Sequence, residues 1–228
     1  MKVIKYGCFA VILTLLVWSL VSYLGLDTGF ELFKSKDKTE TKTTETASDD
    51  DALMEESNHM KFRGVPIDGS LDLFVKRMQR KGFDVVNKKG LSAVMRGDFA
   101  DYTNCLLYVE TLDGKDLVAR IVVAFPVRDK WEYLHGDYKR LKDMLSQKYG
   151  KPYQCTEKFQ NNYSLPMDDG DKLQYVKMDR CKYESLFRSD KGEVVLKITQ
   201  ENLDCRVALA YKDKLNGEAV RRHAIEDL

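Results

Sequence analysis

Residues 102–127 read YTNCLLYVETLDGKDLVARIVVAFPV, two runs rich in Val, Ile, Leu and Tyr on either side of an Asp-Gly pair. Asp-Gly between two such runs is among the strongest short-range signals for a β-hairpin. Because side chains alternate along a strand, Ile121 and Val123 would face one way and Arg120 the other. This stretch therefore predicts two antiparallel strands, and we take them as the centre of the fold.

Further elements are expected on both sides of the hairpin. Apolar residues at three-four spacing predict a helix over 70–81, with Ser70 as N-cap, and a longer helix over 129–149 that ends at Gly150. Alternating runs predict additional strands, at 83–87, 91–99, 181–189, 193–200 and 205–212. The segment 153–181 has no clear period, and we treat its centre as a polar loop followed by a short helix or a strand.

The order of these elements indicates the fold class. Each long helix precedes strands that end in a hairpin, which suggests a tandem helix-plus-meander repeat with halves 60–127 and 128–213. We predict an α+β fold for a globular domain 60–228. It would be an antiparallel sheet of about six or seven strands with two main helices on one face, preceded by one transmembrane helix.

Residues 6–26, YGCFAVILTLLVWSLVSYLGL, contain no charged side chain and follow Lys2 and Lys5. A helix of this length spans about 30 Å, the hydrocarbon thickness of a bilayer. We predict that 1–26 is an uncleaved signal anchor. A cleaved signal peptide stays open, although such peptides have a shorter apolar core and a small-residue cleavage site. A lipoprotein signal at Cys8 is excluded because Lys5 stands where an aliphatic residue is needed.

The positive-inside rule places the N-terminus in the cytoplasm, so the predicted location is the inner membrane, single pass, with the domain in the periplasm. Residues 27–59 contain four lysines and ten acidic residues and few aromatics. Such a stretch cannot bury enough apolar surface to fold, and we predict a disordered acidic tether. The remainder, 60–228, has a net charge of +5, too weak and dispersed for nucleic-acid binding.

Four cysteines in the predicted domain are disulfide candidates, since the expected compartment is oxidising. They are Cys105, Cys155, Cys181 and Cys205. Their pairing is left open, and buried free thiols are the alternative. No two of them have C-x-x-C spacing, which argues against a zinc site or a thioredoxin-type pair.

We identify no catalytic, cofactor-binding or metal-binding motif. His59, His135 and His223 lie far apart in the sequence and are interpreted as surface residues. The acidic run 168–171, Asp-Asp-Gly-Asp, lacks the alternation and terminal Glu of an EF-hand loop, so we interpret it as a solvated loop rather than a calcium site. We therefore expect no cofactor and no enzymatic activity.

Four short patterns resemble an uncharacterised family of envelope proteins from the Bacteroidales. They are Phe62-x-Gly64-Val-Pro-Ile-x-Gly69, Gly97-Asp-Phe99-Ala with Asn104-Cys105, Tyr149-Gly-Lys-Pro152, and Val176-Lys-Met-Asp-Arg-Cys181. The resemblance covers most of 60–213 and implies an exported Gram-negative protein, with no activity attached. The acidic tether departs from the family pattern. The layout is also similar in outline to β-lactamase-inhibitor-like folds and small outer-membrane-assembly lipoproteins.

The function expected from the sequence is a membrane-tethered, non-enzymatic binding domain of the cell envelope. Its partners would be the membrane, through residues 6–26, and an envelope protein or glycan. One alternative is an envelope hydrolase that uses acids from 168–171. The other, motivated by the fold analogy, is an inhibitor or immunity-type protein.

Overall fold

The hairpin predicted from residues 102–127 lies at the centre of the sheet. Strands β5 (Tyr102–Thr111) and β6 (Val118–Ala124) pair antiparallel, with Val109 opposite Ile121. The computed structural model describes residues 57–112, 115–160 and 168–218. The Asp-Gly pair at 113–114, the predicted anchor and residues 27–56 of the predicted tether lie outside these ranges. The chain divides into the units 1–44 and 45–228, and all that follows concerns the second.

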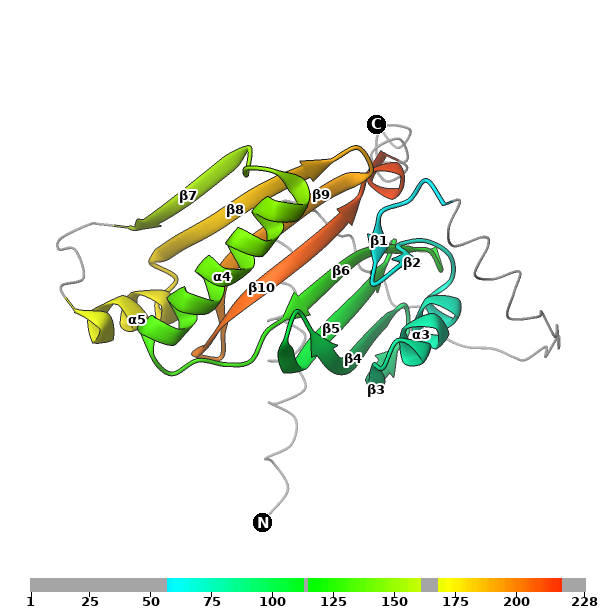
Figure 1. Cartoon of the computed structure of the whole chain (residues 1–228). Helices are drawn as coiled ribbons and strands as arrows, with labels where there is room; N and C mark the ends of the chain where they lie inside the picture. The colour runs from blue at the N-terminus through cyan, green and yellow to red at the C-terminus, as the bar shows by residue number, and fades with distance from the viewer. Residues whose placement is uncertain (1–56, 113–114, 161–167, 219–228) are drawn as a thin grey trace, which may run out of the picture. The chain divides into compact units, whose positions relative to one another are not determined.

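Eight strands form one antiparallel sheet in the order β3-β4-β5-β6-β10-β9-β8-β7 (Figure 1). The other six strands are β3 (Asp84–Lys89), β4 (Ser92–Phe99), β7 (Gln154–Phe159), β8 (Cys181–Ser189), β9 (Gly192–Glu201) and β10 (Asp204–Asp213). Because β6 and β10 are neighbours, the two halves of the chain meet at the middle of the sheet. The edges are β3 and β7.

Helices α3 (Leu71–Arg80), α4 (Trp131–Tyr149) and α5 (Asp169–Lys177) all pack on one face of this sheet. Helix α3 contacts β3, β4 and β5, whereas α4 and α5 contact β8, β9 and β10. Thus α3 precedes four strands, and α4 precedes the other four. The α+β class and the antiparallel sheet with helices on one face are confirmed.

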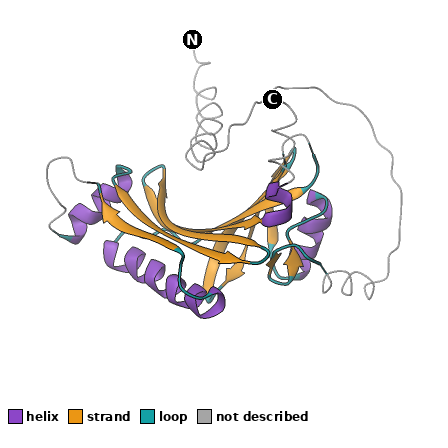
Figure 2. Cartoon of the chain, turned by 90° about the horizontal axis from the view of Figure 1, so that it is seen from above, coloured by secondary structure: helices purple, strands orange, loops and turns teal. Residues whose placement is uncertain are grey.

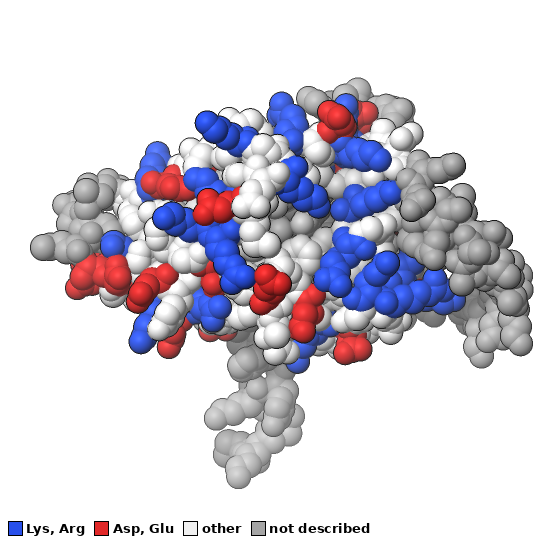
Figure 3. All heavy atoms as spheres, viewed as in Figure 1, with Lys and Arg blue, Asp and Glu red and all other residues white. Residues whose placement is uncertain are grey.

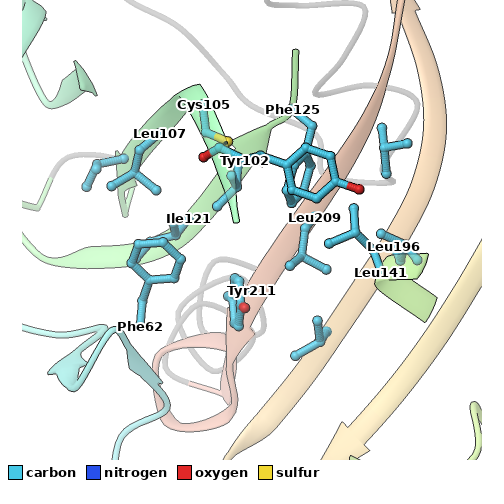
Figure 4. Close-up of a cluster of buried hydrophobic side chains, with 14 of the residues drawn as sticks. Phe62, Tyr102, Cys105, Leu107, Ile121, Phe125, Leu141, Leu196, Leu209 and Tyr211 are labelled. Carbon is cyan, nitrogen blue, oxygen red and sulfur yellow. Dashed lines mark hydrogen bonds between the residues drawn. The ribbon is translucent and has the colours of Figure 1, made fainter. Parts of the chain in front are cut away.

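The core lies between the helices and the sheet, where apolar side chains from both halves meet (Figure 4). Leu141 of α4 packs toward Leu196 and Leu209, and each of these three side chains is at most 2% exposed. Burial of one such side chain contributes about 1.5–3 kcal/mol. The three-four spacing that predicts α4 therefore also forms the contact between helix and sheet.

A short hairpin at the start of the domain closes one end of the core. Strands β1 (Lys61–Phe62) and β2 (Val65–Pro66) are joined by a turn in which Arg63 and Gly64 both have positive φ, 52° and 84°. Two successive residues with positive φ are characteristic of a type I′ turn. This turn places the Phe62 ring between those of Phe99 and Tyr211, with centroids 5.0 and 5.3 Å away.

Three predictions from the sequence are corrected by the structure. The main sheet has eight strands rather than six or seven, because residues 154–159 form β7. Helix α5 starts at Asp169, inside the predicted polar loop. The acidic run at its start has a structural role, since the Asp168 side chain accepts a 2.8 Å hydrogen bond from the Asp171 backbone N–H. Asp168 is therefore an N-cap, which explains the local concentration of acids.

Candidate functional site

The sheet face opposite the helices is the strongest candidate for a binding surface. Strand pairing aligns Tyr108, Val122, Ala210 and Val195 in one row across β5, β6, β10 and β9. The helices described above all contact the other face. Figure 2 shows the sheet curving so that the side without these helices is concave.

We call this surface the helix-free face. Its members alternate in sequence with the core residues of the same strands. They include Arg96, Leu106, Tyr108, Arg120, Val122, Ala124, Leu186, Val195, Lys197, Arg206, Ala208 and Ala210, together with the acids Glu110, opposite Arg120, and Glu184, opposite Lys197. The centre is apolar, because four small buried side chains form a cluster against which Tyr108 and Leu186 pack.

Two arginines of this face, one on each side of its apolar centre, have an unsatisfied donor. Arg120 is 8% exposed, and its Nη1 lies 3.3 Å from Glu110 Oε2. Arg206 is half-buried, with Nη2 3.7 Å from Asp204 Oδ2. In both residues the Nε atom is buried and has no hydrogen-bond partner, which holds for no other fully buried side-chain N or O atom of the described residues. A buried donor without a partner costs about 1–3 kcal/mol, and a bound acceptor would recover part of this energy.

Lys197 adds a further cation to the helix-free face, beside Arg96, Arg120 and Arg206. It lies on β9 opposite Ala208, and within the described chain no side chain or carbonyl hydrogen-bonds its ammonium. Burial and the nearby charge of Arg120 lower the pKa of Lys197, while Glu184 and other acids oppose the shift. The neighbouring acids therefore balance the charge of the Lys197 ammonium only in part, and a bound anion would stabilise the charged form.

A cavity of about 340 Å³ opens on this face beside the cations. Arg96, Asn104 and Arg206 supply polar groups to its wall. The rest of its lining is largely apolar and consists of Leu106, Ala124, Phe125, Pro126 and Val127. Binding sites commonly combine an apolar wall with a few convergent polar groups. This cavity could hold a side chain or group that is partly apolar and negatively charged.

The backbone beside the cavity is strained. Asn104 has φ 58°, and its N–H donates a 3.1 Å hydrogen bond to Asp98 Oδ1 at the bulge where β4 and β5 lose register. Gly97 lies in the same bulge, where an added Cβ would come within 2.7 Å of the Phe83 ring. Non-glycine residues with positive φ cost energy and are enriched at binding sites. This observation favours the cavity over other hollows.

The helix side offers two weaker candidates. A cavity of about 480 Å³ is lined by Arg128, Glu132, Tyr133, Gly136 and Asp137. There, Arg128 Nε is already paired with Asp137 Oδ2 at 2.6 Å, which raises the pKa of Arg128 against the effect of its burial. With Arg128 paired and Glu132 also in the lining, this cavity has little to offer an acidic ligand.

Lysine and arginine side chains also gather on the helix side near α3 (Figure 3). Lys76, Arg77, Arg80 and Lys81 belong to α3 or its C-cap. Cations in the last turn complement the negative end of the helix dipole, which accounts for this cluster without a ligand.

The four predicted disulfide candidates all carry free thiols. Strand β9 lies between Cys181 on β8 and Cys205 on β10, a separation of about 9.5 Å, whereas a disulfide needs Cα atoms within about 7 Å. Cys155 is opposite Ser185, four residues along β8 from Cys181, or about 13 Å away. Cys105 lies on β5 in the other half of the sheet. The described residues therefore contain no disulfide bond.

The histidines do not come together. His59, predicted at the end of the tether, lies in the folded domain with Nδ1 3.0 Å from the buried Asp213 Oδ2 and Nε2 3.4 Å from Asp68. His135 stacks on Trp131 at 5.1 Å between ring centroids, and burial lowers its pKa. His223 lies outside the described residues.

The helix-free face is the candidate binding surface that sequence reasoning missed. Its residues come from six strands between positions 96 and 210, and only the pairing register brings them together. One signal was available in the sequence. Arg120 interrupts the most apolar strand of the chain, and a charged residue in a central strand must face a polar surface or a partner.

None of the helices in the described part of the chain is both long and apolar enough to cross a membrane. No group of three or more His, Cys, Asp or Glu side chains suited to a metal ion occurs among the described residues. Comparison of the chain with protein-family models, with curated proteins and with solved structures found no match.

Proposed function

We propose that this protein is a membrane-tethered, non-enzymatic binding domain of the cell envelope, and that its helix-free face binds an acidic, partly apolar segment of another envelope protein. The observation that carries the proposal is the buried, unpartnered Nε donor of Arg206 in the wall of the cavity, with a second such donor, that of Arg120, elsewhere on the same face. Buried donors that find no partner within the fold are suited to an acceptor brought by a ligand.

The chemistry of the face supports a carboxylate ligand. Arg96 and Arg206 flank the cavity, and a guanidinium group binds a carboxylate through two parallel hydrogen bonds. Lys197 adds a charge that the fold compensates only in part. The apolar row that includes Tyr108 would receive the aliphatic side chains of the same segment. A purely ionic ligand would leave this row unused.

The sequence supports the location. Residues 6–26 have the length and flanking lysines of a signal anchor, and residues 27–59 would hold the domain away from the membrane. The resemblance to Bacteroidales envelope proteins points to the same compartment. The two helix-plus-four-strand halves support the predicted tandem repeat, with the binding face formed where the halves meet.

The hydrolase alternative loses its motivation in the structure. It relied on acids from 168–171, yet Asp168, Asp169 and Asp171 are exposed, and Asp168 caps α5. An inhibitor or immunity-type protein remains the runner-up, and it too would act by binding a protein.

The proposal can be tested by fluorescence anisotropy with the full-length protein in detergent micelles. The probes are two labelled ten-residue peptides, one of alternating Glu and Leu and one of alternating Lys and Leu. We expect only the Glu-Leu peptide to bind, with affinity reduced about tenfold or more by Arg206→Gln, the effect of losing one charge-assisted pair. The control is Arg140→Gln, which removes an exposed arginine on the helix side. Equal binding of both peptides, or equal loss in both variants, would refute the proposed site.

A further inference from the structure

A second cluster of reactive side chains lies on the helix side, between α4 and the edge strand β7. The Cys155 Sγ atom is 3.3 Å from Lys142 Nζ, 3.4 Å from Glu157 Oε1 and 3.5 Å from Ser185 Oγ. The Ser185 hydroxyl is in turn 2.7 Å from the Tyr138 hydroxyl. An exposed thiol thus has a cation, a carboxylate and a hydroxyl within contact distance.

The charge states of the neighbours suit a reactive thiol. Lys142 Nζ is 2.6 Å from Glu157 Oε1. Burial alone would lower the pKa of Lys142, but its hydrogen bonds to Glu157 and Cys155 outweigh burial, so the net shift is upward. Burial alone would raise the pKa of Glu157, but hydrogen bonds from Lys142, Cys155 and Tyr138 lower it overall. At neutral pH the thiol therefore faces an ammonium and a carboxylate.

The other described cysteines are less accessible than Cys155. Burial raises the pKa of Cys105 to about 11 and that of Cys181 to about 12, and it also raises the pKa of Cys205. Cys105 and Cys205 are at most 1% exposed. Among the cysteines that the structure describes, only Cys155 combines an accessible sulfur with a cation in hydrogen-bond contact, the microenvironment typical of modifiable cysteines.

We propose that Cys155 is a site of reversible thiolation, at which its sulfur forms a mixed disulfide with a small aliphatic disulfide. The Cys155 thiol gives its proton to solvent. The Cys155 thiolate attacks one sulfur of the disulfide, a new S–S bond forms, and the original S–S bond breaks. The departing thiolate takes the electron pair and is reprotonated, so Cys155 is oxidised as the reagent is reduced.

Two neighbours have defined roles in this step. The Lys142 ammonium stabilises negative charge on the attacking sulfur, while the Ser185 hydroxyl, oriented by Tyr138, can donate to the same atom. No second described cysteine lies within disulfide distance of Cys155, so none of Cys105, Cys181 and Cys205 would release the mixed disulfide. The adduct would persist until an external thiol reduces it.

The test uses oxidised glutathione as the reagent and the full-length protein in detergent micelles at pH 7.5. Adducts are trapped with acid and assigned to each cysteine by mass spectrometry. The reference is a short unstructured peptide with the sequence of residues 152–158. We expect Cys155 to react about tenfold faster than the cysteine of this peptide, and dithiothreitol to reverse the adduct.

Three variants separate the cluster from simple exposure. Lys142→Met should slow the reaction of Cys155 about tenfold, and Lys142→Arg should keep most of the rate, because an adjacent cation is what the step requires. The matched control Lys139→Met removes an exposed lysine of the same helix and should have no effect. Unmodified Cys105 and Cys205 in each sample show that the fold is intact. A rate equal to that of the peptide, or a Lys142→Met rate equal to wild type, would overturn the proposal.

Discussion

Replacing Lys197 by methionine should make the domain more stable while weakening its binding face. The ammonium is half-buried near Arg120 and forms no hydrogen bond within the described chain. Methionine keeps most of the aliphatic length and removes the charge. A partly buried cation whose charge is only partly balanced destabilises the fold. We therefore expect the variant's free energy of unfolding to be higher by about 0.5–1 kcal/mol at pH 7. For a domain of this size, the midpoint temperature would rise by about 1–4 °C.

The sign of the pH dependence follows from the lowered pKa of Lys197. Between the folded-state pKa and the ordinary value of 10.5, the unfolded chain binds more protons than the folded one. Wild-type stability therefore rises with pH across that window. Below the folded-state pKa the destabilisation is complete, and above 10.5 it is absent. The difference between Lys197→Met and wild type should thus be largest near pH 7 and vanish above 10.5.

Urea unfolding of wild type and variant, followed by circular dichroism at pH 7 and at pH 10.8, measures this difference. The matched control is Lys182→Met, which removes a lysine of the neighbouring strand β8 that is 43% exposed and 3.6 Å from Glu184 Oε1. We expect the control to change stability by less than about 0.5 kcal/mol. If Lys197→Met destabilised the domain at pH 7, or if its effect were the same at both pH values, the electrostatic account of the helix-free face would be wrong.

Three further changes test a buried hydrogen bond, a turn conformation and a close packing contact. Ser185→Ala removes a hydrogen-bond partner of the buried Tyr138 hydroxyl, and we expect the free energy of unfolding in urea to fall by about 1–2 kcal/mol. In the double variant, Tyr138→Phe should add less than it costs alone. Strictly additive effects would argue against the contact. Leu203 in the β9–β10 turn is 62% exposed and has φ 71°, a conformation that glycine adopts more easily. Leu203→Gly should therefore raise the free energy of thermal unfolding by about 0.5–1 kcal/mol. A decrease would mean that the leucine side chain packs favourably. Gly97→Ala would place a Cβ 2.7 Å from the Phe83 ring and should cost about 2 kcal/mol or more by calorimetry, so an unchanged midpoint would show that this ring moves freely.

Much of the fold could be predicted because local and tertiary signals agree. Ser70 caps α3 through a 3.3 Å hydrogen bond from the Leu73 N–H, and the apolar positions that predict the helix are the ones it buries. Likewise, strands β8 to β10 start and end within one residue of their predicted bounds.

The elements that were missed have weak sequence patterns for physical reasons. Strand β7 reads QCTEKF and has no fully buried residue, because it is an edge strand covered only in part by α4. Helix α5 buries only Leu173 and Val176, so its apolar period is too short to detect. In both cases the element is stabilised mainly by a neighbouring helix or strand, and its own sequence carries little periodic pattern.

The candidate site could not be predicted for a different reason. Its cations lie at positions 96, 120, 197 and 206, and no spacing along the sequence connects them. The register of β6 with β10, which places Val122 opposite Ala210, determines that they share one face. That register depends on the long connection between the two halves, so sequence patterns alone do not reveal it.

The most direct test of the helix-free face as a binding surface is site-specific photo-crosslinking in cells that produce the full-length protein. A photoreactive side chain in place of Val127, which lines the cavity and is 44% exposed, is compared with one in place of Tyr133, which is 51% exposed on the helix side. We predict an adduct from position 127 but not from 133, attached to an acidic segment of another envelope protein and lost in Arg206→Gln. Adducts only from position 133, or an adduct at 127 unaffected by Arg206→Gln, would contradict the account.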